Sequence, residues 1–242
     1  LDIELYSDGG AYADLSTSIM ERAMLHSDNS YFFPNMRVTG QVCKTNHHPH
    51  TAFRGFGGPK GVATIEKIIE EIAHKLDLDP FEVRKLNLYS DQGKRNLTHY
   101  GQIFKNNCLL RLHDELAAKC DYKKRREDIK AYNKQNHNFV RGMSLTSVKF
   151  GISFTTRFLN QANALVIIHN DGSLQIATGA TEMGQGVNAR ISAMVTHELG
   201  LQREAARVMP TRTDKNANTS PTAASSGTDL NGAAAILAVR KI

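Results

Sequence analysis

Three stretches of small residues, each placed directly before an expected helix, constrain this chain more than any other feature. They cover residues 51–59, 181–186 and 219–228, and they lead into helices expected to begin at Gly61, at Val187 and directly after the third stretch. Helix N-termini present free N–H groups and the positive end of the helix dipole, so each is a candidate anion site. One such loop alone is better explained as a tight turn. Three in one chain indicate a large polar ligand with several anionic groups.

The periodicity of apolar residues predicts an α+β fold with mixed sheets and packed helices. Between residues 62 and 76 apolar side chains recur every three or four positions, which predicts an amphipathic helix. From residue 138 strand-like runs dominate, and Asn170-Asp171-Gly172 predicts a hairpin. We therefore place a soft boundary near residue 136, which divides residues 1–136 from residues 137–242.

Three local features lead to more specific expectations. The alternation in residues 1–14, with a turn at Gly9-Gly10, predicts a strand pair at the start of the chain. Residues 148–154 also read as a strand. Phe32, Phe33, Phe53 and Phe158 are expected in the core because large aromatic side chains are most often buried.

Composition and charge exclude several classes of protein. About 40% apolar and 22% charged residues are typical of a folded globular protein, and no apolar run is long enough to span a membrane. Lys123 to Arg126 form a basic run, but Glu127 and Asp128 follow at helical pairing distance, which indicates a solvated helix face. We therefore expect no nucleic-acid partner, and the net charge of +6 fits acidic or phosphorylated ligands better.

The ends of the sequence and its cysteines indicate the setting of the protein. The first residues carry neither a basic start nor an apolar run, so no signal peptide is expected. The three cysteines match no disulfide or zinc pattern, which favours a reducing cytoplasm. The last residues read as a helix with no stop signal, and we expect the chain to be a piece of a longer protein.

A group of histidines precedes the first small-residue loop. His47, His48 and His50 could suggest a zinc site, but no cysteine or carboxylate lies at a suitable spacing in the sequence. The sequence therefore favours no metal site at these histidines.

Five short motifs follow one another in an order known from one protein family. A-F-R-G-F-G-G-P occupies residues 52–59, T-E-M-G-Q-G residues 181–186 and S-P-T-A-A-S residues 220–225, while K-F-G-I-S-F (149–154) and F-L-N-Q-A (158–162) lie between them. Together they resemble the molybdenum-binding subunit or domain of the xanthine dehydrogenase/aldehyde oxidase family. The resemblance implies part of the molybdenum-cofactor-binding region of a larger enzyme, with a molybdenum–pterin cofactor (molybdopterin).

The resemblance also implies which residues hold this cofactor. Arg54 and Ala224 would lie near the molybdenum through their backbones, and Gln185 near the terminal metal ligands. The other cofactor-binding residues that it implies are Met183, Gly184, Ser225, Ser226, Gly227 and Thr228.

A second set of residues is implied for substrate binding. Phe56 would cover one face of a planar substrate, and Phe154 would lie edge-on to the ring with Thr155 within hydrogen-bonding reach. Arg22 lies in S-I-M-E-R-A (18–23), a segment similar to the one in which xanthine-oxidising members of the family place a substrate-binding arginine. A surface arginine on an amphipathic helix is the alternative. A guanidinium that donates to a purine oxygen suits the charge that accumulates there.

What the resemblance implies about the reaction reaches beyond this chain. Hypoxanthine and xanthine would be oxidised to urate with water as the oxygen source, and electrons would pass to 2Fe-2S and FAD groups on a partner subunit or domain of a homodimeric enzyme. The family's general-base glutamate is not in this sequence and is expected downstream. Two alternatives remain: an aldehyde or N-heterocycle hydroxylase of the same family, and a non-catalytic relative that keeps the cofactor-binding fold.

Overall fold

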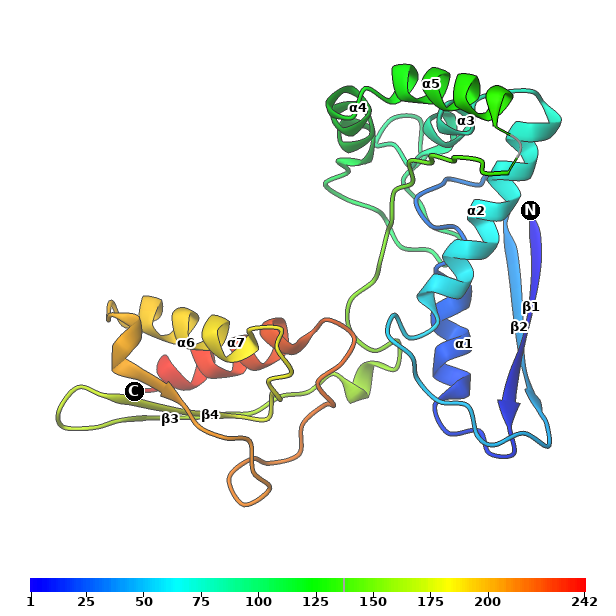
Figure 1. The fold of residues 1–242 in the computed structure, drawn as a ribbon. Helices are drawn as coiled ribbons and strands as arrows, with labels where there is room; N and C mark the ends of the chain where they lie inside the picture. Colours follow the sequence, from blue (N-terminus) through cyan, green and yellow to red (C-terminus); the bar gives the residue numbers. More distant parts are fainter. Residues whose placement is uncertain (137) are drawn as a thin grey trace. The chain divides into compact units, whose positions relative to one another are not determined.

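The chain folds into two compact units, Leu1–Phe150 and Gly151–Ile242, in a computed structural model that describes residues 1–136 and 138–242 (Figure 1). Each unit combines helices with a small sheet, so the predicted α+β class is confirmed. None of the helices in these described ranges is long and apolar enough to cross a membrane.

The first unit begins with two parallel strands joined by a helix. The strands are β1 (Asp2–Gly10) and β2 (Arg37–Lys44), and α1 (Ser16–Leu25) connects them. The strand pair expected within residues 1–14 is therefore wrong. β1 runs through both glycines, and its hydrogen-bonding partner lies on the far side of α1.

Four further helices complete this unit: α2 (Gly58–Lys75), α3 (Pro80–Asn87), α4 (Leu109–Lys119) and α5 (Tyr122–Gln135). The apolar face of α2 is fully buried at Ile65 and Ile69, as its periodicity predicts. Asp79 caps α3 by accepting a hydrogen bond of 2.8 Å from the N–H of Phe81.

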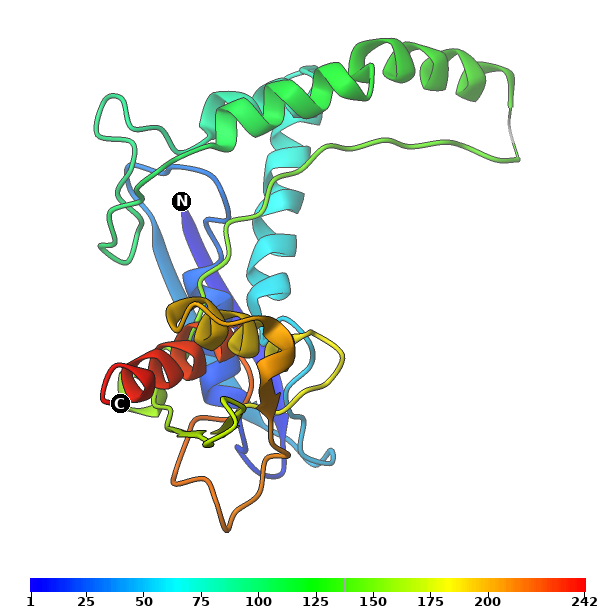
Figure 2. The same ribbon diagram turned by 90° about the vertical axis from the view of Figure 1, so that its left-hand side faces the viewer.

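The segment of residues 138–150 returns from the far end of α5 without forming a helix or strand (Figure 2). The strand expected over residues 148–154 is wrong because side-chain amides take its backbone hydrogen bonds. In the first unit the N–H of Lys149 donates to Oδ1 of Asn29 (3.1 Å), and in the second the N–H of Phe154 donates to Oδ1 of Asn160 (2.9 Å).

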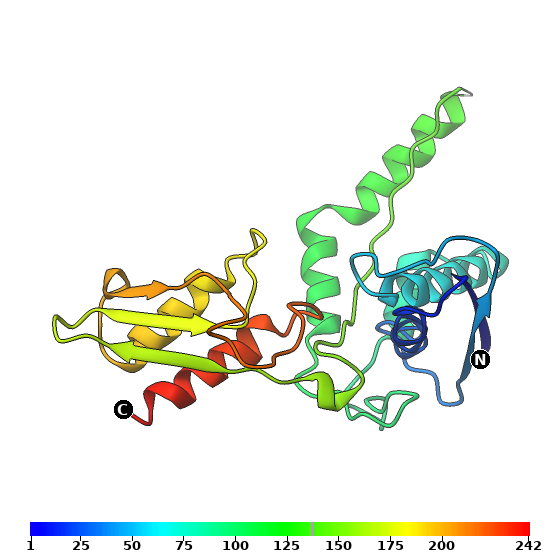
Figure 3. The same cartoon turned by 90° about the horizontal axis from the view of Figure 1, so that it is seen from below.

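The second unit is a three-stranded mixed sheet with two helices on one face (Figure 3). β3 pairs antiparallel with β4 through the expected hairpin, and β4 pairs parallel with β5. Ile176, Ile191 and Ala235 are fully buried between the sheet and the helices. The elements are β3 (Ala164–Ile168), β4 (Leu174–Thr178), α6 (Val187–Glu198), β5 (Ala206–Val208) and α7 (Gly227–Val239), with short 3-10 turns at Arg157–Leu159 and Arg203–Ala205.

Two aromatic side chains expected in the core are exposed. Phe53 is 87% exposed and Phe158 is 77% exposed. Phe53 belongs to the loop before α2, and Phe158 to the 3-10 turn at Arg157–Leu159. Neither position lies on a helix or strand face that packs against the core, so the expectation of burial is wrong for both.

Candidate functional site

The first small-residue loop is held tightly against α1 at the point where α2 begins. A Cβ added to Gly57 would lie 2.1 Å from the backbone oxygen of Ile19, which leaves no room for a side chain. A Cβ on Gly58 would lie 2.5 Å from the ring of Phe150. The helix expected at Gly61 accordingly begins earlier, at Gly58, because the close approach fixes the loop and the first turn of α2 together.

Arg54 and Phe56 lie on this loop in different surroundings. Phe56 adopts a left-handed backbone conformation with φ of 49°, and its N–H donates to the oxygen of Phe53 over 2.8 Å. Such a conformation costs a non-glycine residue about 1–2 kcal/mol, so packing of the loop must hold it. The Phe56 side chain is half-buried, whereas Arg54 is exposed.

Arg22 lies inside the first unit on α1 and is only 3% exposed. Its guanidinium carbon stands 5.5 Å from the centre of the Phe150 ring, the same ring that Gly58 approaches. Burial lowers the pKa of Arg22 from its ordinary value. The surface position that an amphipathic helix offers is thus not the one that Arg22 occupies, because the side chain lies on the buried face of α1 beside the small-residue loop.

A buried ionic network lies directly after α1. The carboxylate of Asp28, 1% exposed, accepts hydrogen bonds from Nζ of Lys149 (2.5 Å) and from the hydroxyl of Tyr89 (2.6 Å), and Nδ1 of His99 is 3.5 Å away. Burial raises the pKa of Asp28, but the neighbouring His99 imidazole and the charge and hydrogen bond of Lys149 outweigh burial and hold the pKa below its usual value. The network therefore keeps a carboxylate charged in the buried segment that follows α1.

The second unit brings its two small-residue loops together. The N–H of Thr181 donates to Oγ1 of Thr222 over 2.9 Å, and a Cβ on Gly179 would collide with the side chain of Thr219. Ala224 accepts a hydrogen bond of 2.7 Å from the N–H of Ser153. Within this unit the structure thus places three segments side by side: the one that carries Phe154 and Thr155, the one that carries Met183, Gly184 and Gln185, and residues 224–228.

The helices that follow these loops run side by side in the same direction (Figure 1). At their N-terminal ends a Cβ on Gly227 would lie 3.6 Å from the side chain of Val187, and at their C-terminal ends Nε of Arg240 is 2.7 Å from Oε1 of Glu198. Two positive helix-dipole ends therefore lie next to each other, between the loop of residues 181–186 and the loop of residues 219–228.

The N-terminus of α6 is already occupied by a carboxylate of the chain itself. Glu182 accepts hydrogen bonds from the N–H groups of Gly184 (3.0 Å), Gly186 (2.8 Å) and Asn188 (3.1 Å). These bonds lower the pKa of Glu182. Gln185 closes the same loop, since Oε1 accepts from the N–H of Met183 and Nε2 donates to the oxygen of Thr181. Glu182 thus supports the loop rather than leaving the helix end open.

The N-terminus of α7 is open, and its donors suit an anionic cofactor. Within residues 1–136 and 138–242, the N–H groups of Gly227, Thr228 and Asp229 have no hydrogen-bond acceptor. Ser226 is buried and bonds to the oxygen of Ala223, whereas Ser225 is exposed. Free backbone N–H groups at a helix N-terminus, with a hydroxyl beside them, are the donors that phosphate oxygens and other anions accept. The residues present therefore fit the pterin cofactor that the sequence resemblance implies.

Phe154 and Thr155 lie in a loop that Asn160 holds in place. The Asn160 side chain accepts from the N–H of Phe154 (2.9 Å) and donates to the oxygen of the same residue (2.8 Å). Both Phe154 and Thr155 are half-buried. Hydrogen bonds with this side chain, and not the ladder of a strand, hold the backbone of Phe154.

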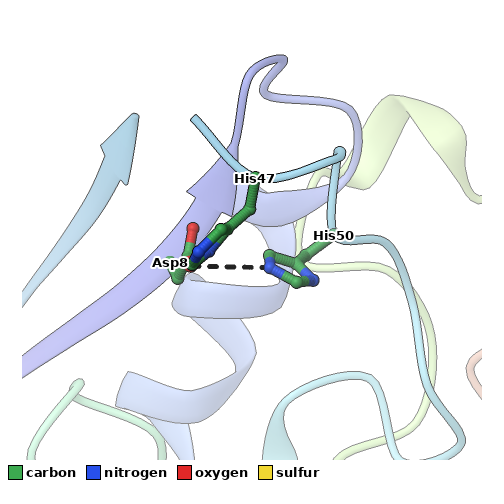
Figure 4. A group of neighbouring side chains, drawn as sticks. All are labelled: Asp8, His47 and His50. Atoms are coloured by element: carbon green, nitrogen blue, oxygen red, sulfur yellow. Dashed lines mark hydrogen bonds and ion pairs between the residues drawn. The ribbon is translucent and has the colours of Figure 1, made fainter. Parts of the chain in front are cut away.

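One group of possible metal ligands cannot be recognised from sequence spacing. Asp8 lies beside His47 and His50, and their ligand atoms are within 4.8 Å of one another (Figure 4). Asp8 is far from the histidines in sequence, and only the parallel pairing of β1 with β2 brings it to them. The expectation that no carboxylate partner is present is therefore wrong.

The folds and loops define an α+β protein that binds a polar, anionic cofactor. Comparison with known families identifies this cofactor. Residues 1–88 match one molybdopterin cofactor-binding domain, and residues 115–242 match a second. The chain belongs to the family of molybdopterin cofactor-binding domains, and molybdopterin is its cofactor.

Curated relatives are similar over essentially the whole chain. It is 45% identical over 234 residues to the xanthine dehydrogenase/oxidase of Gallus gallus, which covers 97% of this chain and 17% of the relative. It is 41% identical to the xanthine dehydrogenase of Dictyostelium discoideum over 242 residues, 100% of this chain and 18% of the relative. The chain thus spans about a sixth of the length of these relatives.

Solved structures show the same fold. The aldehyde oxidoreductase of Desulfovibrio desulfuricans superposes with a TM-score of 0.80 at 25% identity, over 98% of this chain and 25% of that one. A reconstituted CO dehydrogenase from Oligotropha carboxidovorans superposes with a TM-score of 0.84 at 21% identity, over 98% of this chain and 31% of that one. The second likeness concerns the fold alone.

Proposed function

We propose that this chain is the cofactor- and substrate-binding part of a molybdenum hydroxylase that oxidises hypoxanthine and xanthine to urate. The observation that carries the choice of purine is the place of Arg22, buried on α1 beside the Phe150 ring and the loop of Phe56. The similarity to curated xanthine dehydrogenases supports the same choice.

The second unit would contribute most of the residues that hold the cofactor. The free N–H groups of Gly227 and Thr228, with the hydroxyls of Ser225, Ser226 and Thr228, would bind its anionic groups at the N-terminus of α7. Gln185 would turn its amide from Met183 and Thr181 toward the cofactor, which Gly184 allows to approach closely. Arg54 and Ala224 would lie near the molybdenum through their backbones. When bound, the cofactor supplies a two-electron oxidation in which water provides the oxygen of the product.

The substrate would be held by stacking and by one fixed charge. Phe56 would cover the face of the purine, Phe154 would meet its edge, and Thr155 would donate or accept a hydrogen bond. Arg22 would donate two N–H groups to a purine oxygen, where negative charge grows as the ring is attacked. Because burial fixes the Arg22 side chain before the substrate arrives, the side chain needs little reorganisation when the ring is attacked.

We place this reaction in a cytoplasmic, homodimeric enzyme that passes the electrons to 2Fe-2S and FAD groups on a partner subunit or domain. The test uses the full-length protein produced with cofactor supply, in which molybdenum per protomer and turnover of hypoxanthine, benzaldehyde and quinoline are measured with an artificial electron acceptor. We expect close to one molybdenum and preferential purine turnover.

Two other results would overturn the proposal in different ways. Turnover of the aldehyde or quinoline without purine turnover would identify an aldehyde or N-heterocycle hydroxylase of the same family. Absence of molybdenum despite cofactor supply would identify a non-catalytic relative.

A further inference from the structure

Two histidines and one aspartate gather at the end of the parallel strands of the first unit. Nδ1 of His47 lies 2.5 Å from Oδ2 of Asp8, and Nε2 of His50 lies 3.5 Å from the same oxygen. Figure 4 shows both imidazole rings facing the carboxylate. The three side chains come from β1 and from the loop after β2, and solvent reaches all of them.

The backbone fixes this arrangement before any ligand arrives. The N–H of Ala11 donates to the oxygen of His47 (3.0 Å), and the N–H of His50 donates to the oxygen of Gly9 (3.3 Å). The hydroxyl of Ser16, in the first turn of α1, donates to the oxygen of His50 (3.1 Å). Both histidines are thus anchored to the end of β1, close to Asp8, so little chain entropy is lost when their side chains bind one ligand.

The two oxygens of Asp8 have different partners. Oδ1 accepts hydrogen bonds from the hydroxyl of Thr45 (2.5 Å) and the N–H of Gly10 (2.9 Å), whereas Oδ2 faces the histidines. A carboxylate whose outer oxygen is hydrogen-bonded in this way is oriented as metal-binding carboxylates are.

The distances are close to those of a metal site. Imidazole nitrogens and carboxylate oxygens bind zinc at about 2.0–2.2 Å, so two ligands of a tetrahedral ion lie roughly 3.3 Å apart. The separation of 3.5 Å between His50 and Asp8 already matches this value. His47 and Asp8 need to move apart by somewhat less than an ångström, which a χ rotation of an exposed imidazole supplies.

We propose that Asp8, His47 and His50 form a binding site for a divalent transition-metal ion such as Zn²⁺, separate from the molybdenum cofactor. Imidazole with carboxylate is a ligand set that zinc, copper and nickel accept. Three protein ligands leave the fourth position of a tetrahedral ion to water. The bound ion joins β1 to residues 45–50, the segment that leads directly into the loop of Arg54 and Phe56.

The test is zinc binding by the full-length protein with its molybdenum cofactor in place. The protein is treated with a chelator, equilibrated with Zn²⁺ in competition with a chromogenic chelator, and analysed for zinc and molybdenum. We compare the wild type with Asp8→Asn and His50→Ala. His48→Ala is the matched control, because His48 is an exposed neighbour in the same loop but lies outside the ligand group.

We expect the wild type and His48→Ala to bind one zinc more per chain than His50→Ala, and Asp8→Asn to weaken that zinc at least tenfold. Molybdenum content should be equal in all four proteins, which separates this result from any failure of the proposed hydroxylase. Equal zinc affinity in all four proteins would overturn the proposal. Anomalous scattering at the zinc edge tests it without a variant: a peak among Asp8, His47 and His50 supports the site, and no peak there at saturating zinc overturns it.

Discussion

The two units differ in how they place charged groups, although both bury some polar side chains. The first buries charged and polar side chains: Arg22 is 3% exposed, and Asp28 and His113 are each 1% exposed. The second exposes the polar loop of residues 181–185, and the N–H groups that begin α7 have no acceptor among the residues that the structure describes. A buried charge is costly unless it is compensated, but it is fixed in one place. Free backbone N–H groups require no buried charge, and they can adjust to an anion.

Residues 1–88 and residues 115–242 each match a molybdopterin cofactor-binding domain, but the two units offer different chemical groups to a ligand. A fixed guanidinium can distinguish substrates by the position of one oxygen, so the first unit is suited to specificity. A surface of N–H groups and hydroxyls can bind anionic groups of different shapes, so the second unit is suited to contribute anion donors for the cofactor. Matched substitutions and changes of pH should therefore affect the stability of the two units to different extents.

The largest difference is expected between two glycines in corresponding loops. Gly57→Ala places a Cβ 2.1 Å from the backbone of Ile19 at a φ of 91°, whereas Gly184 has a similar φ of 94° with open space around it. Backbone strain and overpacking together should make Gly57→Ala destabilise the first unit by about 4 kcal/mol. In Gly184→Ala only the backbone strain remains, which should destabilise the second unit by about 1 kcal/mol. Hydrogen exchange of α1 and α6 in the full-length protein measures both. Equal effects would mean that the first loop is not clamped against α1.

A smaller, pH-dependent difference is expected from buried histidines. Burial lowers the pKa of His26 and of His113 below 6.5, so the unfolded state binds more protons than the folded state as pH falls. The first unit should therefore lose stability from about pH 6.5 downward, toward the lower pKa values of the folded state, by at most roughly 1.4 kcal/mol per histidine and pH unit.

The pH dependence of stability in each unit is measured by hydrogen exchange. The protein is equilibrated in urea at each pH and is then labelled after a jump to one common pH. His113→Gln should flatten the pH profile of the first unit. The control is His197→Gln, because His197 is exposed on α6. A first unit that is equally stable at pH 7.5 and pH 5.5 would contradict the assignment of neutral buried histidines.

The smallest effect is expected at Glu182. Glu182→Ala removes the acceptor of three N–H groups at the start of α6, in a loop exposed to water that can replace it. Protection of α6 against hydrogen exchange should fall by less than in Gly184→Ala, and Glu182→Gln should restore part of it. Unchanged protection in Glu182→Ala would show that the helix end does not depend on this carboxylate.

Local signals in the sequence predicted much of the fold. Asp79-Pro80 begins α3, and Asn170-Asp171-Gly172 lies between β3 and β4, because a cap and a tight turn depend on adjacent residues. The pairing of β1 with β2 depends on contacts across α1, and no local pattern encodes it. The same holds for the segment around Lys149, whose N–H bonds to the side chain of Asn29, 120 residues away.

The candidate site also combines features that local sequence predicts with features that depend on long-range contacts. The motifs placed the small-residue loops directly before α2, α6 and α7, where the structure has them. They did not show that Glu182 occupies one of the helix ends or that Asp8 meets His47 and His50. Both findings depend on side-chain geometry, and the second also requires a strand pairing that the sequence did not reveal.

The proposed preference for a purine depends most directly on the charge of Arg22. Its guanidinium should stabilise negative charge on a purine oxygen by about 2–4 kcal/mol in the transition state, or roughly 30- to 1000-fold in rate. Arg22→Met keeps the length and the apolar stem, so the packing on Phe150 should survive, and Arg22→Lys should restore only part of the rate because an ammonium lacks the planar fork.

The decisive measurement is therefore kcat/KM of wild type and Arg22→Met for hypoxanthine and for an aromatic aldehyde, with molybdenum content as the control for folding. We predict a loss of 30- to 1000-fold on the purine, little change on the aldehyde and unchanged molybdenum. Equal losses on both substrates would contradict the account, because Arg22 would then support the fold and not the substrate.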